Sequence, residues 1–252
     1  MSMQQVEVHW GSIEGLPQGV EDFLSPAEAE HFSQLRFAAR RQSYLLGRLA
    51  GKLLLLQQPA LANLQPQEIS ILNLSSGAPY VLVKGEVIPG SLSLSHSGEF
   101  GVSAYTSASG FAVGVDVEML LPRSAGLVQD FFTPQEFALI AALPEEERIE
   151  WVNRLWSAKE AVLKAFGLGL RIDTRQVEIL PSSYPVCSDG WQALQVHSPF
   201  IPTSAYQVFS RCESGFVLSL AVFSPKEQPE GFLVNITLEK LEVPLESCEM
   251  KE

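Results

Sequence analysis

The sequence predicts an α+β fold made of two similar halves, because the same order of local signals occurs twice. Ser25-Pro26-Ala27-Glu28 combines a serine cap, a proline in the first turn and a glutamate at the capping-box position, which together mark a helix start. Thr133-Pro134-Gln135-Glu136 repeats this arrangement. A turn leading into a strand at residues 97–105 also recurs at residues 214–222. We therefore expect an old internal duplication.

Each predicted helix start leads into a longer helix, at residues 39–57 in the first half and 145–166 in the second. Short runs that are bounded by turn residues predict the strands. These strands are expected at residues 69–74, 80–84, 91–95, 176–180, 191–196, 206–210 and 232–238. We expect residues 1–106 to form the N-terminal half and residues 107–252 the C-terminal half, which ends in a frayed acidic tail.

The composition indicates a folded globular protein. The chain has 252 residues, 46% of them hydrophobic, and a formal net charge of −12, which argues against a nucleic-acid-binding protein. Three scattered cysteines are too few for a disulfide framework or a zinc site. The sequence shows neither a signal-peptide pattern nor an apolar run long enough to span a membrane, so we expect a cytoplasmic protein.

Asp116 and Glu118 are two carboxylates one residue apart in the apolar run of residues 111–119. In a β-strand, the alternation of side chains places both acids on one face and the neighbouring valines on the other. Paired, half-buried carboxylates are unfavourable without a cation, and a hard divalent ion with oxygen ligands is the usual partner. Taken alone, the pair is more often a solvated polar face of a strand.

Residues 151–166 predict an amphipathic helix. Trp156, Glu160 and Lys164 form a row along the edge of its apolar arc, whereas Lys159 falls inside the arc. A Glu160–Lys164 pair is by itself more often a solvated helix pair. A lysine on the core-facing side is harder to explain in that way, although its long stem can reach out to water.

The predicted helix of residues 39–57 carries a cationic stripe. Arg41, Arg48 and Lys52 lie within a narrow angular band beside its leucine face, and no acid occurs from residue 31 to residue 52. Such a stripe can hold phosphates, because arginine gives forked hydrogen bonds and lysine a point charge. It is equally typical of a solvated helix face.

Two turns complete the candidate residues. Ser95 and His96 end a predicted strand, and a serine hydrolase is excluded because adjacent strand residues point to opposite faces and no Gly-x-Ser-x-Gly elbow occurs. His96 could donate to a phosphate, although a lone histidine in a turn is more commonly structural. Gly77-Ala78-Pro79 predicts a tight turn whose backbone can approach a ligand closely.

Together these pieces resemble the Sfp-type 4′-phosphopantetheinyl transferases. The resemblance covers residues 77–170, and the acid pair and the last helix are its most specific parts. The matching motifs are Gly77-Ala-Pro79, Leu94-Ser-His-Ser97, Val113-Gly-Val-Asp-Val-Glu118, Phe131-Phe-x-x-x-Glu136, Leu155-Trp-Ser-x-Lys-Glu-Ala-x-x-Lys164 and Gly167-x-Gly-Leu170.

The resemblance implies a pseudo-dimer of two similar α/β halves, with coenzyme A held in the cleft between them. It implies transfer of the 4′-phosphopantetheine arm of coenzyme A to a serine of an apo acyl or peptidyl carrier protein, with release of adenosine 3′,5′-bisphosphate. The acids Asp116, Glu118 and Glu160 would hold Mg²⁺, or Mn²⁺, on the diphosphate.

The same resemblance assigns the coenzyme A contacts. Ser95 and His96 would meet the region of the 3′-phosphate, and the turn Gly77-Ala78-Pro79 would lie along the adenine. The family commonly has lysine where this chain has Ala78, which removes one cation. Assigning Arg41, Arg48 and Lys52 to phosphates rests mainly on their spacing.

For the chemistry, we expect Asp116 and Glu160 to be catalytic, with Glu160 as the base, acting directly or through a metal-bound water. Lys164 is expected to assist the leaving phosphate, and Lys159 to contact the cofactor in the same way. We expect the carrier to dock on a local basic or apolar patch near Arg123 and the helix that starts at Thr133.

Two other functions agree less well with the sequence. A non-catalytic coenzyme A or carrier-binding protein of the same fold would be expected to have lost one of the three acids, and all three are present. A two-metal phosphodiesterase or pyrophosphatase would need more clustered acids and histidines. The sequence does not specify which carrier protein is the substrate. We expect a monomer, because the duplication supplies both halves.

Overall fold

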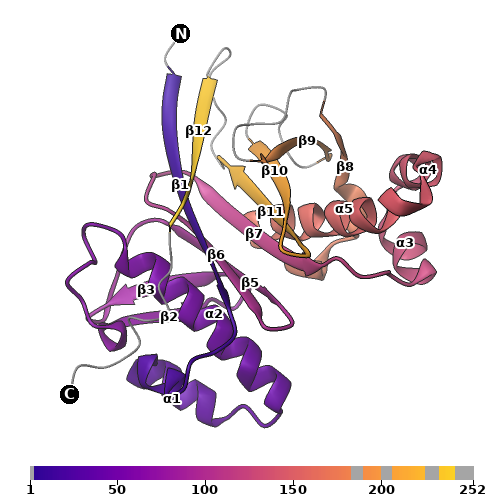
Figure 1. Ribbon diagram of the computed structural model, residues 1–252. Coiled ribbons are helices and arrows are strands. Elements are labelled where there is room, and N and C mark those ends of the chain that lie inside the picture. The colour runs from indigo at the N-terminus through magenta and orange to yellow at the C-terminus, as the bar shows by residue number, and fades with distance from the viewer. Residues whose placement is uncertain (1–2, 183–189, 200–205, 225–232, 242–252) are drawn as a thin grey trace. The chain divides into compact units, whose positions relative to one another are not determined.

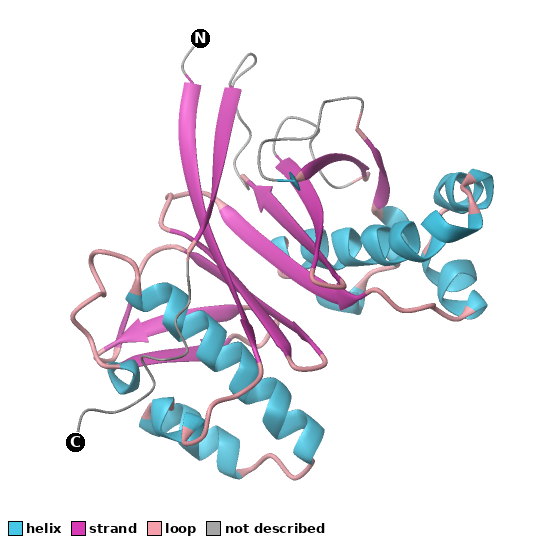
Figure 2. Ribbon diagram, in the orientation of Figure 1, coloured by secondary structure: helices cyan, strands magenta, loops and turns pink. Residues whose placement is uncertain are grey.

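The computed structural model describes residues 3–182, 190–199, 206–224 and 233–241 (Figures 1 and 2). These residues divide into two compact units, of which unit 1 lies within Met1–Ser109 and Phe232–Glu252, and unit 2 within Gly110–Gly231. The predicted tail beyond residue 241 lies outside the described residues.

The C-terminal strand differs from the predicted division at residue 106. Strand β12 (Leu233–Lys240) pairs in parallel with β1 (Met3–Glu14) and so belongs to unit 1, although residues 107–252 were expected to form one half. Strand β1 itself was not among the predicted strands, even though Val6, Val8 and Trp10 alternate with polar residues and are fully buried.

Unit 1 contains a four-stranded sheet of order β12-β1-β6-β5, a three-stranded sheet of order β2-β3-β4, and two α-helices. Its further elements are η1 (Val20–Phe23), α1 (Pro26–Ser33), α2 (Ala38–Leu56), η2 (Pro66–Glu68), β2 (Ile69–Asn73), β3 (Pro79–Val83), β4 (Glu86–Val87), β5 (Ser91–Ser97) and β6 (Phe100–Thr106). The buried face of α2 packs on β6 and β5 (Figure 1). One core cluster joins Leu45, Leu46 and Leu49 of α2 to Ile13 and Phe32.

Unit 2 is a five-stranded antiparallel sheet of order β7-β11-β10-β9-β8 that packs against the long helix α5. Its elements are β7 (Ala112–Met119), α3 (Ala125–Phe131), α4 (Pro134–Ala142), α5 (Glu145–Ala165), η3 (Gly169–Arg171), η4 (Thr174–Gln176), β8 (Glu178–Pro181), β9 (Gln192–His197), β10 (Tyr206–Glu213) and β11 (Phe216–Phe223). The core-facing positions of α5 include Val152, Leu155, Val162 and Leu163, which lie in the segment predicted as an amphipathic helix.

The predicted α+β fold is confirmed, and the duplication is visible in the order of elements. In each unit a short helix with a capping box precedes a long helix, a hairpin and a pair of antiparallel strands. Helices α1 and α2 thus correspond to α4 and α5, and β5 and β6 correspond to β10 and β11. No helix in the described part of the chain is long and apolar enough to cross a membrane.

Candidate functional site

The acids Asp116 and Glu118 lie on the face of β7 that packs against α5. Gly114 shares this face, and a Cβ atom on it would lie 1.9 Å from the carbonyl oxygen of Ala161 and 2.5 Å from the backbone nitrogen of Ala165. Only a residue without a side chain permits so close an approach of helix and strand. The glycine therefore sets the distance between α5 and the two acids.

This packing aligns the predicted row on α5 with the acids on β7. Trp156 Nε1 donates a hydrogen bond of 2.9 Å to Glu118 Oε1. Two turns later, Lys164 Nζ donates to Asp116 Oδ1 at 2.7 Å and to the carbonyl oxygen of Val115 at 3.1 Å. The face of β7 expected from a period of two residues thus contacts the face of α5 expected from a period of 3.6 residues, within unit 2.

Glu160 lies between these two contacts in the helical row. Its pKa is raised to about 7, first by burial and then by the negative charges of Asp116 and Glu118, against the positive charge of Lys164. Among the described residues, none forms a hydrogen bond or ion pair with the Glu160 carboxylate. A carboxylate with a pKa near neutrality is suited to accept a proton.

Arg123 forms a contact that the sequence analysis did not predict, since it assigned this residue to carrier docking. Its Nη2 donates to Glu118 Oε2 at 2.6 Å, and its Nε donates to Asn153 Oδ1 at 2.6 Å. The Asn153 Nδ2 atom in turn donates to the carbonyl oxygens of Leu121 and Ile149, each at 2.8 Å. Asn153 therefore holds the loop after β7, the start of α5 and Arg123 together.

The three acids are chemically suited to a hard cation, because carboxylate oxygens are the ligands that Mg²⁺ prefers. The pKa of Glu160 is raised mainly by burial and also by the negative charges of the other two acids, and a cation would relieve this repulsion. Within the described ranges, however, no group of three or more His, Cys, Asp or Glu side chains is arranged to hold a metal ion. Asp116 and Glu118 instead face Lys164 and Arg123.

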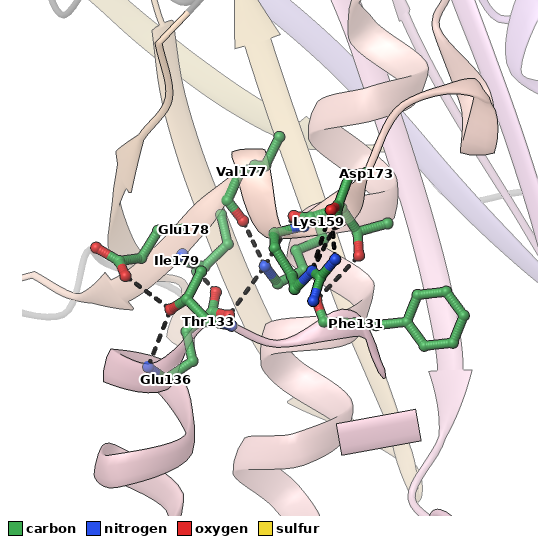
Figure 3. A network of polar contacts seen from close by, with 10 residues as sticks. Phe131, Thr133, Glu136, Lys159, Asp173, Val177, Glu178 and Ile179 are labelled. Carbon is green, nitrogen blue, oxygen red and sulfur yellow. Dashed lines mark hydrogen bonds and ion pairs between the residues drawn. The ribbon is translucent and has the colours of Figure 1, made fainter. Parts of the chain in front are cut away.

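Lys159 is a buried structural residue, and its predicted contact with a cofactor is not supported. Its side chain is 0% exposed, and Nζ lies 2.9 Å from Glu136 Oε2 (Figure 3). Nζ also donates to the carbonyl oxygens of Thr174 and Val177. The carboxylate of Glu136 also accepts hydrogen bonds from the backbone N–H groups of Thr133 and Ile179, each at 2.7 Å. The amine is therefore closed off from any ligand.

Lys52 requires the same correction in unit 1. Its side chain is also 0% exposed, its Nζ lies 2.5 Å from Glu28 Oε2, and it donates to the carbonyl oxygens of Phe23 and Pro66. The Glu28 carboxylate accepts hydrogen bonds from the backbone N–H groups of Ser25 and Ile71, each at 2.8 Å. In both units, the capping-box glutamate thus neutralises a buried lysine of the long helix.

The other predicted cofactor residues of unit 1 differ in exposure. Arg48 is 11% exposed, packs on the Tyr44 ring and donates to Asn73 Oδ1 at 2.7 Å. Asn73 Nδ2 donates to the carbonyl oxygen of Gly77, so Arg48 is linked to the turn that begins the Gly77-Ala78-Pro79 motif. Arg41 is more accessible, at 37% side-chain exposure, and faces Glu21.

Gly77 has a φ of 93°, in the region that favours glycine, which confirms the predicted tight turn. Ser95 and His96 lie on β5, opposite Val102 and Gly101 of β6. Ser95 is buried and His96 is exposed. Their side chains point to opposite faces of the strand, so only one of the two can face a given ligand group.

The duplication places the acids in unit 2 only. Ser103 and Ser219 are each the fourth residue of their strands, β6 and β11, and their partners across the sheet are Gly11 and Asp116. By the same register, Ile13 corresponds to Glu118. Leu53 follows the buried Lys52, as Glu160 follows Lys159. Unit 1 therefore carries uncharged residues at all three positions.

Residues 112–208 match the model of the family described as ACPS: 4′-phosphopantetheinyl transferase superfamily. This segment contains all three acids and Lys164. The resemblance stated from the sequence motifs is therefore confirmed.

Several relatives carry the name 4′-phosphopantetheinyl transferase. A Synechocystis sp. protein provisionally named a 4′-phosphopantetheinyl transferase is 30% identical over 63% of this chain and 63% of its own length. The 4′-phosphopantetheinyl transferase HetI of Nostoc sp. is 35% identical over 35% of this chain and 38% of its own. In both cases the match spans less than two thirds of the relative.

Among solved structures, the holo-[acyl-carrier-protein] synthase (AcpS) of Thermotoga maritima matches 48% of this chain and 71% of its own, with 25% identity and a TM-score of 0.37.

Proposed function

We propose that this chain is a 4′-phosphopantetheinyl transferase that transfers the 4′-phosphopantetheine moiety of coenzyme A to a serine of an apo acyl or peptidyl carrier protein, which the match of residues 112–208 to the superfamily model supports. The products are the holo carrier and adenosine 3′,5′-bisphosphate. The observation that carries the proposal is the set of three carboxylates from β7 and α5, in which Glu160 has a pKa of about 7 and Lys164 lies beside Asp116.

The transfer exchanges one phosphorus–oxygen bond for another. The serine oxygen attacks the phosphorus that bears the pantetheine arm, and the bond from that phosphorus to the bridging diphosphate oxygen breaks. Glu160 accepts the hydroxyl proton, because its carboxylate forms no ion pair in the described part of the chain and has a pKa near neutrality. Lys164 supplies positive charge for the departing bisphosphate.

Magnesium, or manganese, is the metal that we propose for this site. Asp116, Glu118 and Glu160 would hold it, and its role when bound would be to neutralise the charge of the diphosphate. The chemistry of the donor set supports this assignment, since all three ligands are carboxylates.

For coenzyme A, we propose that Arg41 and Arg48 meet phosphate groups and that the backbone of the Gly77-Ala78-Pro79 turn meets the adenine. The link from Arg48 through Asn73 to Gly77 supports a shared ligand for the helix and the turn. Lys52 and Lys159 are left out of this set, because both amines are fully buried.

The carrier protein is proposed to dock on unit 2, near Arg123 and α4. Leu121, Phe137 and Ile149 are large apolar side chains that are 40% or more exposed. Two of them, Leu121 and Ile149, are joined through Asn153 to the Arg123–Glu118 pair. An apolar patch suits an acidic carrier that is not attracted by the acidic chain as a whole. We further infer a monomer acting in the cytoplasm.

Incubation with coenzyme A, Mg²⁺ and a panel of apo carriers, followed by intact-mass measurement, tests the proposed activity. We expect a mass increase of one phosphopantetheine on at least one carrier. Binding of coenzyme A or a carrier without any mass increase would instead indicate the non-catalytic binding protein. No binding and no transfer would contradict both functions.

A further inference from the structure

Glu118 is the proposed metal ligand whose two oxygens are both engaged by the chain itself. Oε1 accepts the indole N–H of Trp156, and Oε2 accepts Nη2 of Arg123 at 2.6 Å. The Glu118 side chain is 19% exposed and that of Arg123 is 24% exposed, so the pair is partly shielded from water. A divalent ion that binds Oε2 therefore has to share this oxygen with the guanidinium or displace it.

Arg123 is held in this position from a second side. Its Nε donates to Oδ1 of Asn153, a fully buried residue of α5 that also fixes the carbonyl oxygens of Leu121 and Ile149. The guanidinium is planar, so fixing Nε also limits the directions in which Nη2 can point. The fold thus fixes the contact between Arg123 and Glu118, which differs in this from a contact between two freely moving surface side chains.

The charges of the site explain why this contact matters. Lys164 forms an ion pair with Asp116, and Arg123 forms one with Glu118. Among the described residues, Glu160 has no ion pair. Two of the three negative charges are therefore already balanced. In the described part of the chain, Asp116 and Glu118 thus face cations of the protein itself, and no group of three or more acids is arranged as a ready metal site.

We propose that Arg123 is a tethered counter-cation that competes with the divalent metal ion for Glu118. The inference rests on the proposed function in one respect, namely that a metal binds at these acids. Arg123 stabilises the carboxylates while no metal is bound, and it weakens metal binding because its positive charge offsets that of Glu118 and repels the metal ion. Lys164 is a less suitable competitor for this role, because it is part of the proposed transfer chemistry.

The test is metal binding to the full chain without coenzyme A or carrier. Mn²⁺ is titrated at fixed pH and ionic strength, and the free ion is followed by electron paramagnetic resonance. Arg123→Gln should bind Mn²⁺ about fivefold more tightly than the wild type, the factor that corresponds to loss of one partly exposed ion pair. Arg123→Lys, which keeps the charge without the forked geometry, should fall between the two.

Arg148→Gln is the matched control for the change in overall charge. Arg148 also lies in unit 2, is exposed, and donates only to the carbonyl oxygens of Leu143 and Ala141. Its substitution should leave the Mn²⁺ affinity within about twofold of the wild type. In a Glu118→Gln background, the gain from Arg123→Gln should disappear, because the contested carboxylate is gone.

Unchanged or weaker Mn²⁺ binding by Arg123→Gln would overturn the inference while leaving the proposed metal site intact. An equal gain in Arg148→Gln would also overturn it, since the effect would then be one of net charge. Absence of Mn²⁺ binding in the wild type and in both Arg123 variants would contradict the metal site itself and the inference with it.

Discussion

Glu136→Gln is the substitution that most directly tests the buried charges of unit 2. The glutamine has nearly the same shape, but it leaves the amine of Lys159 buried without its counter-charge. Burial already raises the pKa of Glu136 and lowers that of Lys159, and the opposite charge of each partner resists these shifts. Removing one member of such a pair typically costs about 3–5 kcal/mol, a large part of the roughly 5–15 kcal/mol that stabilises a whole domain.

Urea unfolding followed by tryptophan fluorescence provides the assay. Trp151, Trp156 and Trp191 lie in unit 2, whereas Trp10 lies in unit 1. The expected loss lowers the unfolding midpoint of unit 2 by roughly 1–5 M urea for a slope of about 1–3 kcal/mol per molar. A loss of less than about 1 kcal/mol would refute the reasoning, because the pair would then not depend on its charges.

Glu28→Gln is the matched control, since it breaks the equivalent pair of unit 1. Its effect should appear in the Trp10 signal and not in the unit 2 signal. A second variant, Glu136→Leu with Lys159→Met, removes both charges at once. Its free energy of unfolding should stay below that of the wild type. The backbone N–H groups of Thr133 and Ile179 also lose their acceptor, which costs about 1–3 kcal/mol each. Full recovery would show that those two hydrogen bonds contribute nothing.

Further predictions concern the acids and their surroundings. Glu160→Gln should abolish transfer while leaving coenzyme A affinity, measured by calorimetry, largely intact; near wild-type turnover would remove Glu160 from the chemistry. Because the pKa of Glu160 is about 7 in the folded protein instead of 4.5, its stabilising contribution should fall as the pH rises from about 4.5 to 7, and Glu160→Gln should remove this component from urea titrations across that window. Gly114→Ala should lower the free energy of unfolding by at least about 1–3 kcal/mol and reduce transfer, because its Cβ would overlap the backbone of α5; a variant as stable as the wild type would contradict the close packing. Ile149→Asp should raise the KM for the carrier but not for coenzyme A, and an unchanged carrier KM would exclude this residue from the docking surface.

The repeated capping boxes were sufficient to predict the duplicated α+β fold, because a helix start is encoded within a few residues. The pairing of β1 with β12 could not be found in that way. It joins segments from opposite ends of the chain, and no local pattern specifies which distant strand a given edge will accept. The division predicted at residue 106 therefore missed the return of the last strand to unit 1.

Local sequence patterns predict the candidate site only in part, as they do the fold. Asp116 and Glu118, and the row that includes Glu160, follow from periodicity, which tells which face a side chain occupies. Periodicity does not tell which residue lies opposite, so the contact of Arg123 with Glu118 was not predicted. For Lys159 the available signal was its place in an apolar arc, which calls for a buried acid as its partner.

The path of β12 has a consequence for the order in which the protein is assembled. Unit 2 is one continuous stretch of chain, inserted between β6 and the last strand of unit 1. As the polypeptide leaves the ribosome, unit 2 can complete its own sheet while one edge of β1 still lacks its neighbour. Exposed strand edges invite pairing with other molecules. Strand β1, which is synthesised before unit 2, is thus among the last parts of the described fold to be covered along both edges, and truncation before β12 should promote aggregation through β1.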